Sequence, residues 1–192
     1  MQSPPDLQFD EAAHAYTVGG VRWPSVTQVL DPINELDGIP RHVLDAAAAF
    51  GTNVHAACHL HNQGTLDEAA LDPALAPYVE AWRRFLSDTG AIVIASEVRV
   101  AHPTLRYAGT LDTIAKIGGV RELVDIKSTA QIPRTVGPQT AAYAEARTEP
   151  RLRRRVVQLR GDGSYVARRL DNRADFNTFV SCLNIWRFRN DQ

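Results

Sequence analysis

The sequence predicts an α/β (α+β) domain in which a small mixed sheet is flanked by helices. Two long segments with helical periodicity occupy residues 40–89, and three strand-like runs follow between residues 91 and 127. The 192 residues, of which 44% are hydrophobic, are enough to bury a single core. We therefore expect one domain over 1–192. Its expected parts are an N-terminal hairpin at 14–23, a core at about 40–150, and a C-terminal hairpin and helix at 151–192.

The first element is an alternating run that indicates a small hairpin. Residues 14–23 alternate around Gly19-Gly20, a dipeptide that suits a tight turn between two strands. Ser25 then stands at the N-cap of a short helix, because its hydroxyl can accept a hydrogen bond from the first turn. The segment 31–39 contains Pro, Gly and Asp and is expected to be a loop.

An alanine-rich helix is expected from Pro40 to about Asn62. Gly51 in its interior costs about 1 kcal/mol relative to alanine, so a close approach of another backbone would explain it. His55 and His59 are four residues apart and share one face of the helix. Their segment lacks the glutamate of a His-Glu-x-x-His zinc site, and no second ligand pair completes a structural zinc site. His59 is therefore interpreted as a packed or exposed residue.

A second helix and a long strand come next. Residues 73–89 carry an apolar stripe typical of helix packing, and Gly90 ends the helix. Residues 91–100 alternate as a strand, which places Glu97 on one face. The opposite face is expected to carry Ile92, Ile94, Ser96, Val98 and Val100.

The stretch from Gly109 to Lys127 carries the most chemistry. Asp112 follows an alternating run and is expected where a strand ends, and Gly118-Gly119 is expected to turn the chain into a second strand over 120–127. Side chains two apart on a strand share a face, so Asp125 and Lys127 point the same way. Two carboxylates and one ammonium are thus predicted to converge at the edge of a small sheet.

Such a cluster favours a divalent cation. Two carboxylates about 4 Å apart repel by about 4 kcal/mol at an effective dielectric near 20, unless protonation, Lys127 or a cation offsets the charge. Hard oxygen ligands with open water positions suit Mg²⁺ or Mn²⁺, and a lysine beside them can orient water or contact a phosphate. On the same grounds Asp112→Asn is expected to leave the metal-free protein as stable or slightly more stable. A surface Asp-x-Lys pair is the alternative for the tripeptide alone.

The remaining elements follow from local patterns. The loop 128–138 is polar, contains two prolines and is expected to form a rim over the site. Gln139 and Tyr143 are four apart and meet on one helix face, where a buried tyrosine hydrogen-bonded to a glutamine is the structural alternative. Residues 155–170 are expected to form a hairpin around Gly161-Asp162-Gly163, and a final helix is expected from about 173 to 189.

The net charge of −1 hides an asymmetry along the chain. Residues 1–146 carry ten Lys/Arg against seventeen Asp/Glu, whereas residues 147–192 carry eleven Arg against five acidic residues. A basic end suits contact with phosphates, although a solvated basic face is the alternative. The candidates for contact with a DNA backbone are Arg151, Arg153, Arg154 and Arg155.

The cysteine count and the hydropathy of the sequence limit the cell compartments in which the protein is expected to work. Cys58 and Cys182 are too few for a disulfide framework or a four-cysteine iron–sulfur cluster, so no iron–sulfur cluster is expected. No run approaches a membrane span, and the start MQSPPDLQFDE lacks the form of a signal peptide. We expect a cytoplasmic protein that does not contact a membrane.

Four short motifs occur in a defined order along the chain. They are Gly51-Thr-Asn-Val-His55, Gly109-Thr-Leu-Asp112, Asp125-Ile-Lys127 and Gln139-Thr-Ala-Ala-Tyr143. In order and spacing they resemble the PD-(D/E)XK nuclease superfamily, and most closely its RecB-type branch, which includes phage exonucleases. Glu97 matches a glutamate that is common there on the preceding strand, and the segment Pro24-Ser25-Val26-Thr27 resembles phage-type members.

The resemblance implies a restriction-endonuclease-like core and a metal-dependent DNA nuclease, an exonuclease of phage-type recombination or repair. It implies that His55, Asp112 and Asp125 bind Mg²⁺ or Mn²⁺, with the Ile126 carbonyl as a further ligand. Glu97 would act through a second metal or its water, and Lys127 would orient the attacking water. Gln139 and Tyr143 would position DNA or the lysine. Ser25 and Thr27 would line the substrate groove, unless their segment is only a packing flap.

Two alternatives stay open from the sequence. One is a nuclease-fold module that binds DNA or a protein partner without cutting, and the other is that the motifs are accidental. A phage-encoded protein would work in the host cytoplasm. The sequence leaves the oligomeric state and any recombination or helicase partner open.

Overall fold

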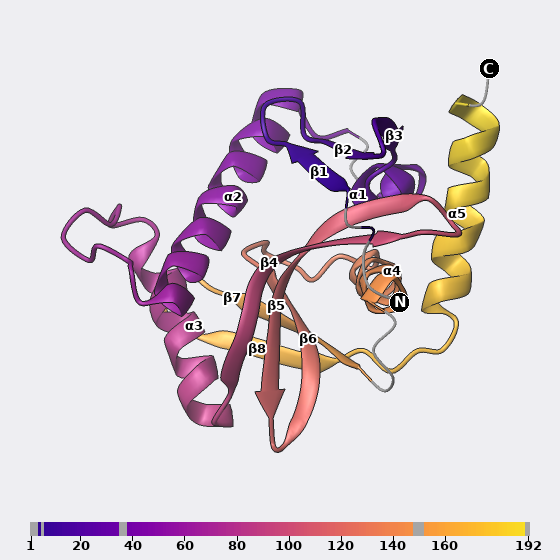
Figure 1. Ribbon diagram of the computed structural model, residues 1–192. Helices are drawn as coiled ribbons and strands as arrows, with labels where there is room; N and C mark the ends of the chain where they lie inside the picture. Colours follow the sequence, from indigo (N-terminus) through magenta and orange to yellow (C-terminus); the bar gives the residue numbers. More distant parts are fainter. Residues whose placement is uncertain (1–3, 5, 35–37, 148–151, 191–192) are drawn as a thin grey trace.

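The protein is built around one five-stranded mixed sheet with helices on both faces (Figure 1). This computed structural model describes residues 4, 6–34, 38–147 and 152–190. Strands lie in the order β4-β5-β6-β7-β8, and a separate three-stranded sheet, β1-β2-β3, lies near the N-terminus. The predicted fold class, a small mixed sheet flanked by helices, is confirmed.

The large sheet consists of an antiparallel meander followed by a crossover. β4 (Ile92–His102), β5 (Tyr107–Ile117) and β6 (Val120–Lys127) are antiparallel neighbours. α4 (Val136–Arg147) carries the chain to β7 (Arg153–Leu159), which pairs parallel with β6, and β8 (Tyr165–Arg169) pairs antiparallel with β7. Parallel neighbours need such a crossover, whereas the antiparallel pairs are joined by short turns. The predicted hairpins at Gly118-Gly119 and at residues 161–163 are therefore confirmed.

One face of the sheet is covered by two helices. They are α2 (Arg41–Gln63) and α3 (Ala76–Thr89). Trp82 and Phe85 of α3 are fully buried against the sheet with Val124 and Ile126 of β6. The apolar stripe predicted for the second helix thus packs into the core, and α2 places His55 on the same side.

The opposite face is covered by α1 (Val26–Leu30), α4 and α5 (Asp175–Asn190), with a short 3-10 helix, η1 (Asp31–Ile33), after α1. Leu111 and Leu123 of the sheet pack there against Tyr143 and Phe179. Leu123 and Val124 are neighbours on β6 and belong to cores on opposite faces, which is the alternation that the strand predicts.

The N-terminal sheet packs over one end of β4 and β5. It contains β1 (Leu7–Asp10), β2 (Ala15–Val18) and β3 (Val21–Trp23), so the predicted hairpin is confirmed and β1 extends it. Tyr16 and Trp23 form a third core cluster with Ala101 and Ala108 of the large sheet. The amide of Ala108 also donates to the carbonyl of Pro24, which fastens the small sheet to the large one.

Two sequence expectations about the strands are wrong. Asp112 lies inside β5, not at its end, because β5 continues to Ile117 along β4. The register of β4 shifts between Val93 and Ala95, and Glu97 adopts a left-handed φ of 53°. These irregularities break the strict alternation that the sequence predicts.

Among the helices that the structure describes, none is long and apolar enough to cross a membrane.

Candidate metal centre

The site lies where β5 and β6 separate. Their pairing covers Thr113↔Val124 through Ile117↔Val120, so the part of β5 before Thr113 pairs with β4 alone. At this fork the carboxylate of Asp112 accepts a hydrogen bond of 2.7 Å from the amide of Ile126. The side chain thereby takes the place of a backbone acceptor for this amide, which would otherwise lose a hydrogen bond inside the protein. The fork explains why a carboxylate is held inside the sheet.

His55 reaches the same carboxylate from α2. Its Nδ1 lies 3.2 Å from Oδ1 of Asp112, and both side chains are largely buried. Burial acts to lower the pKa of His55, but the charge of Asp112 and the hydrogen bond outweigh it, so the pKa is raised. Burial acts to raise the pKa of Asp112, but His55, Lys127 and the Ile126 amide hold it below its usual value. The two residues therefore stabilise each other's charged forms.

Glu97 faces Asp112 from the neighbouring strand. The pairs Ser96↔Thr113 and Val98↔Leu111 place these two carboxylate residues opposite each other. Partial burial of the carboxylate and the negative charge of Asp112 raise the pKa of Glu97 to about 7, even though part of the side chain contacts solvent. The charge of His55 acts in the opposite direction but compensates the charge of Glu97 only in part.

The three side chains form a group suited to a cation. One ligand atom each from His55, Glu97 and Asp112 lie within 4.8 Å of one another. Two carboxylate oxygens with one imidazole nitrogen, at an edge open to water, match the preferences of Mn²⁺ and Mg²⁺. A cation between the carboxylates would also relieve the repulsion that raises the pKa of Glu97. On the chemistry of its donor atoms, the site fits a divalent metal.

Asp125 and Lys127 lie beside this group and pair with each other. Nζ of Lys127 lies 2.8 Å from Oδ2 of Asp125, as expected for residues two apart on β6. Burial and the charge of Asp112 outweigh the lysine and raise the pKa of Asp125 to about 6. Burial acts to lower the pKa of Lys127, but Asp125 and Asp112 outweigh it and raise the pKa. Lys127 is therefore an ammonium at neutral pH.

The predicted ligand set and the observed group differ in two residues. Glu97 joins His55 and Asp112 directly, instead of acting only through a second metal or its water. Asp125 is outside the group of three, because its carboxylate turns to Lys127. Ile126 contributes its amide to Asp112, and its carbonyl stays a predicted ligand.

Gln139 and Tyr143 lie next to the fork on α4. The amide nitrogen of Gln139 donates to the Tyr143 hydroxyl over 3.4 Å, and the tyrosine is nearly fully buried. Burial raises the pKa of Tyr143, as do the charges of Asp112 and Asp125. A Cβ atom at Gly109 would lie 2.6 Å from Cε1 of Tyr143, closer than real side-chain contacts come. The glycine and the tyrosine of two separate motifs therefore depend on each other through packing.

His59 has a role that its sequence pattern does not reveal. Its Nδ1 lies 2.6 Å from Oγ of Ser96, and Nε2 lies 3.0 Å from the side-chain amide nitrogen of Gln63. The amide nitrogen can only donate, so Nε2 accepts and the Nδ1 proton points to Ser96. Ser96 therefore shares the α2 side of β4 with Glu97, although the alternation places the two on opposite faces. The left-handed φ of Glu97 interrupts that alternation.

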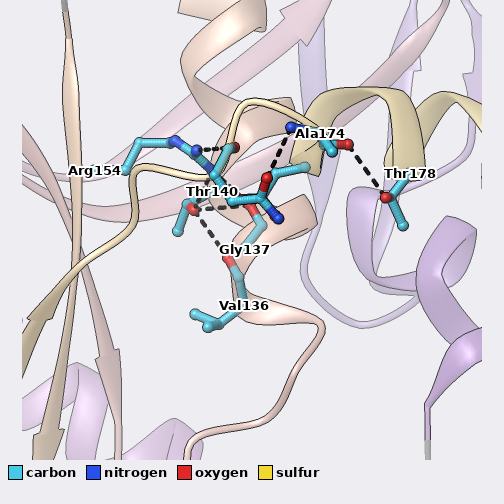
Figure 2. A network of polar contacts seen from close by, with 8 residues as sticks. Val136, Gly137, Thr140, Arg154, Ala174 and Thr178 are labelled. Atoms are coloured by element: carbon cyan, nitrogen blue, oxygen red, sulfur yellow. Dashed lines mark hydrogen bonds and ion pairs between the residues drawn. The ribbon is translucent and has the colours of Figure 1, made fainter.

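Two of the four arginines proposed for DNA contact are engaged inside the fold. Figure 2 shows Arg154 beside Gly137 and Thr140 at the start of α4. Its guanidinium donates to the Gly137 carbonyl (2.8 Å) and pairs with the Asp175 carboxylate at the start of α5 (2.8 Å). Arg155 makes two hydrogen bonds to the buried carboxylate of Glu122, at 2.7 and 3.2 Å. Both guanidinium groups stabilise the fold through these internal contacts. We therefore do not propose that Arg154 or Arg155 contacts DNA.

The other residues predicted to contact DNA differ from one another in how exposed they are. Arg153 is exposed on β7, and Arg151 lies outside the described residues. Ser25 is buried, and its hydroxyl caps α1 by accepting from the amide of Gln28. Thr27 is exposed, and its hydroxyl hydrogen-bonds to that of Ser25 at 2.9 Å. The N-cap prediction for Ser25 is confirmed, and this capping occupies its hydroxyl.

Comparison with known proteins finds likeness at the level of solved structures only. No family model matches the chain, and no curated protein matches it. An alkaline exonuclease (LHK-Exo) from Laribacter hongkongensis is 15% identical over 86% of each chain, with a TM-score of 0.42. The same exonuclease in complex with dAMP is 18% identical over 87% of each chain, with a TM-score of 0.41. SSO0001 is 11% identical over 86% of this chain and 84% of that chain, also with a TM-score of 0.41. Similarity at this level assigns neither a family nor an activity.

Proposed function

We propose that the protein is a metal-dependent deoxyribonuclease that hydrolyses phosphodiester bonds. The observation that carries the proposal is the convergence of His55, Glu97 and Asp112 on one point, with the ammonium of Lys127 beside Asp112. Three ligands on an edge open to water leave positions for water and for a phosphate oxygen. A bound divalent ion there would activate water and stabilise the charge that develops on the phosphate.

The residues of the chain prepare the site for this reaction. Asp112 is held as a carboxylate by the amide of Ile126 and by His55, so its oxygens keep a fixed direction. His55 presents an imidazole from α2 to the carboxylate of Asp112. Asp125 holds the Lys127 ammonium at 2.8 Å, which leaves other Nζ protons to orient a water or to contact a phosphate oxygen.

The proposed cofactor is Mn²⁺ or Mg²⁺. Because one of the three ligands is an imidazole nitrogen, Mn²⁺ is expected to support cleavage at least as well as Mg²⁺. Cleavage with Ca²⁺ alone would contradict this scheme. We further propose that the enzyme is an exonuclease of phage-type recombination or repair, acting on DNA in the cytoplasm, with a recombination or helicase protein as a candidate partner. These finer proposals rest on the sequence resemblance.

The test compares cleavage of linear and circular DNA, single- and double-stranded, with Mn²⁺ or Mg²⁺. Lys127→Ala is expected to abolish cleavage, whereas Lys116→Ala, which removes the exposed lysine of β5, should leave it unchanged. Degradation of linear DNA only would support an exonuclease, and cutting of circles would indicate an endonuclease. Equal cleavage by wild type and Lys127→Ala would point to a contaminating nuclease. Binding of DNA without cleavage under either metal would favour the module that binds and does not cut.

A further inference from the structure

Two rows of side chains lead away from the metal centre on the same face of the sheet. Thr110 lies two residues before Asp112 on β5, and Arg99 lies two residues after Glu97 on β4. Arg99 and Thr110 are cross-strand partners, and the two carboxylate residues lie between the pairs Ser96↔Thr113 and Val98↔Leu111. Residues two apart on a strand share a face and lie about 7 Å apart along it. Arg99 and Thr110 are therefore one step from the carboxylates, toward the N-terminal sheet.

The N-terminal sheet places aromatic rings over this step. The Tyr16 hydroxyl hydrogen-bonds to Oγ1 of Thr110 at 2.8 Å, which fixes β2 above β5. The Phe9 ring packs on that of Tyr16 at 4.5 Å between centroids, and His14 meets the edge of Phe9 at 5.3 Å. The guanidinium of Arg99 lies over the Phe9 ring, 5.4 Å from its centroid. Phe9 thus contacts the guanidinium of Arg99 close to the metal centre.

Arg99 differs in its surroundings from the arginines that are held by acidic partners. Arg154 and Arg155 pair with internal carboxylates, and Arg83 and Arg84 pair with glutamates on the surface. Arg99 is exposed and makes no ion pair with a carboxylate of the described residues. A guanidinium that is held over an aromatic ring has lost part of its rotamer freedom, so less side-chain entropy is lost when a ligand binds.

We propose that Arg99, Phe9 and His14 form a platform that binds an unpaired DNA strand next to the scissile phosphate. This proposal rests on the proposed nuclease function and gives its substrate class. The free face of the Arg99 guanidinium can stack on a base or pair with a phosphate, and the exposed His14 ring offers a second stacking surface. Stacking needs bases that are not paired, so the platform favours a single-stranded end over an intact duplex.

The platform lies close enough to the metal centre to guide a DNA strand toward it. It is connected to the carboxylate cluster by the strand pair β4–β5, with Tyr16 and Thr110 as a hydrogen-bonded joint. A strand lying on Arg99 would enter the metal centre from the side of the N-terminal sheet. The small sheet then acts as part of the substrate groove through its aromatic rings and not through Ser25, whose hydroxyl caps α1.

The test measures binding of fluorescent single-stranded and duplex oligonucleotides by anisotropy, in EDTA so that nothing is cut. Arg99→Gln and Phe9→Leu are expected to weaken single-strand binding about tenfold, from the loss of base stacking. Their effect on blunt duplex should be much smaller. Arg22→Gln removes an exposed arginine from β3 of the same small sheet and should change neither affinity.

Two further outcomes would overturn the proposal, and one control measurement checks that the Arg99→Gln variant is intact. Equal losses in Arg99→Gln and Arg22→Gln would reduce the effect to general electrostatics and overturn the platform. Equal losses for single strand and duplex would overturn its preference for unpaired DNA. An unchanged melting-temperature rise with Mn²⁺ in Arg99→Gln confirms that the fold and metal centre are intact.

The failure of the platform proposal and the failure of the proposed nuclease function can be distinguished. Wild-type cleavage without dependence of binding on Arg99 contradicts the platform alone, and dependence on Arg99 without wild-type cleavage contradicts the hydrolysis alone.

Discussion

The side chains of Arg154 and Asp112 are both largely enclosed by protein, but the charges around them are balanced in different ways. The guanidinium of Arg154 is matched by the Asp175 carboxylate, and Arg155 is matched by Glu122. Arg154 also donates to the Gly137 carbonyl at the start of α4 (Figure 2). Around Asp112, in contrast, two more carboxylates compete for His55 and Lys127, and the pKa values of Glu97 and Asp125 are raised.

The difference indicates what each cluster is for. Buried charges that satisfy one another hold elements together, here β7, α4 and α5. Carboxylates that remain uncompensated destabilise the fold unless a ligand supplies the missing positive charge. The Arg154 cluster therefore holds the fold together, whereas the Asp112 cluster is the one that we propose to bind a cation and a substrate.

The largest expected effect is the loss of cleavage in Asp112→Asn. Asp112 joins His55, Glu97 and the Ile126 amide, and removal of its charge weakens the proposed metal site. A metal contributes several kcal/mol to the stabilisation of a phosphoryl transition state, so the rate should fall at least about 100-fold. The measurement is the cleavage rate of linear DNA with saturating Mn²⁺. Cleavage by Asp112→Asn at the wild-type rate would place the chemistry elsewhere.

The lowered pKa of Asp112 leads to a second expectation for the same variant, which differs from the one drawn from the sequence. Relief of repulsion predicted that Asp112→Asn would leave the metal-free protein as stable or more stable. The pKa of Asp112 is lowered, which means that the fold stabilises its charge through His55 and Lys127. The pKa of Glu97 is raised, so relief of repulsion is expected from Glu97→Gln instead.

The next effect is a loss of stability in Arg154→Met. Removing one partner of a buried ion pair leaves the Asp175 carboxylate without its cation and costs about 3–5 kcal/mol of unfolding free energy. Denaturant unfolding measures it, with Arg153→Met, an exposed arginine of the same strand, as the control. A loss below about 1 kcal/mol would show that the network in Figure 2 does not hold the fold.

The stabilisation produced by a bound metal should depend on the Asp112 cluster and not on the arginines of β7. Addition of Mn²⁺ at about 100 times its Kd is expected to stabilise the wild type by about 2.7 kcal/mol, seen as a rise in melting temperature. Glu97→Gln should reduce this rise because a ligand oxygen loses its charge, whereas Arg153→Met should show the full rise. Equal metal-induced rises in wild type and Glu97→Gln would place the metal away from Glu97.

The smallest expected effect is a change in the pH dependence of stability. The pKa of Glu97 is about 7 in the folded protein and near 4.5 when unperturbed, so between these values the folded chain holds more protons than the unfolded chain. The contribution of Glu97 to stability therefore declines as pH rises from about 4.5 through 7. In EDTA, Glu97→Gln should lose less stability than wild type over this range in thermal unfolding. Parallel curves of stability against pH for wild type and Glu97→Gln would mean that the pKa of Glu97 is not raised in the folded protein.

Much of the fold follows from local patterns in the sequence. The Gly118-Gly119 turn, the alternation of residues 120–127 and the helical periodicity of residues 40–89 predict elements that the structure contains. Side chains at i and i+2 of a strand share a face, which is why Asp125 and Lys127 could be paired from their spacing alone. These are short-range properties of the backbone and need no knowledge of the packing.

The details of the site come from the tertiary structure. Sequence spacing could not show that β5 and β6 separate at Asp112 and pair only from Thr113 onward, or that Glu97 turns toward Asp112 through a left-handed φ. It also could not show that Arg154 and Arg155 are paired internally, or that Phe9 supports Arg99, because these partners are far apart along the chain. By itself the sequence determined the elements and the motif residues. Strand register and long-range packing decided which charges meet, since these depend on how the elements pack together in space.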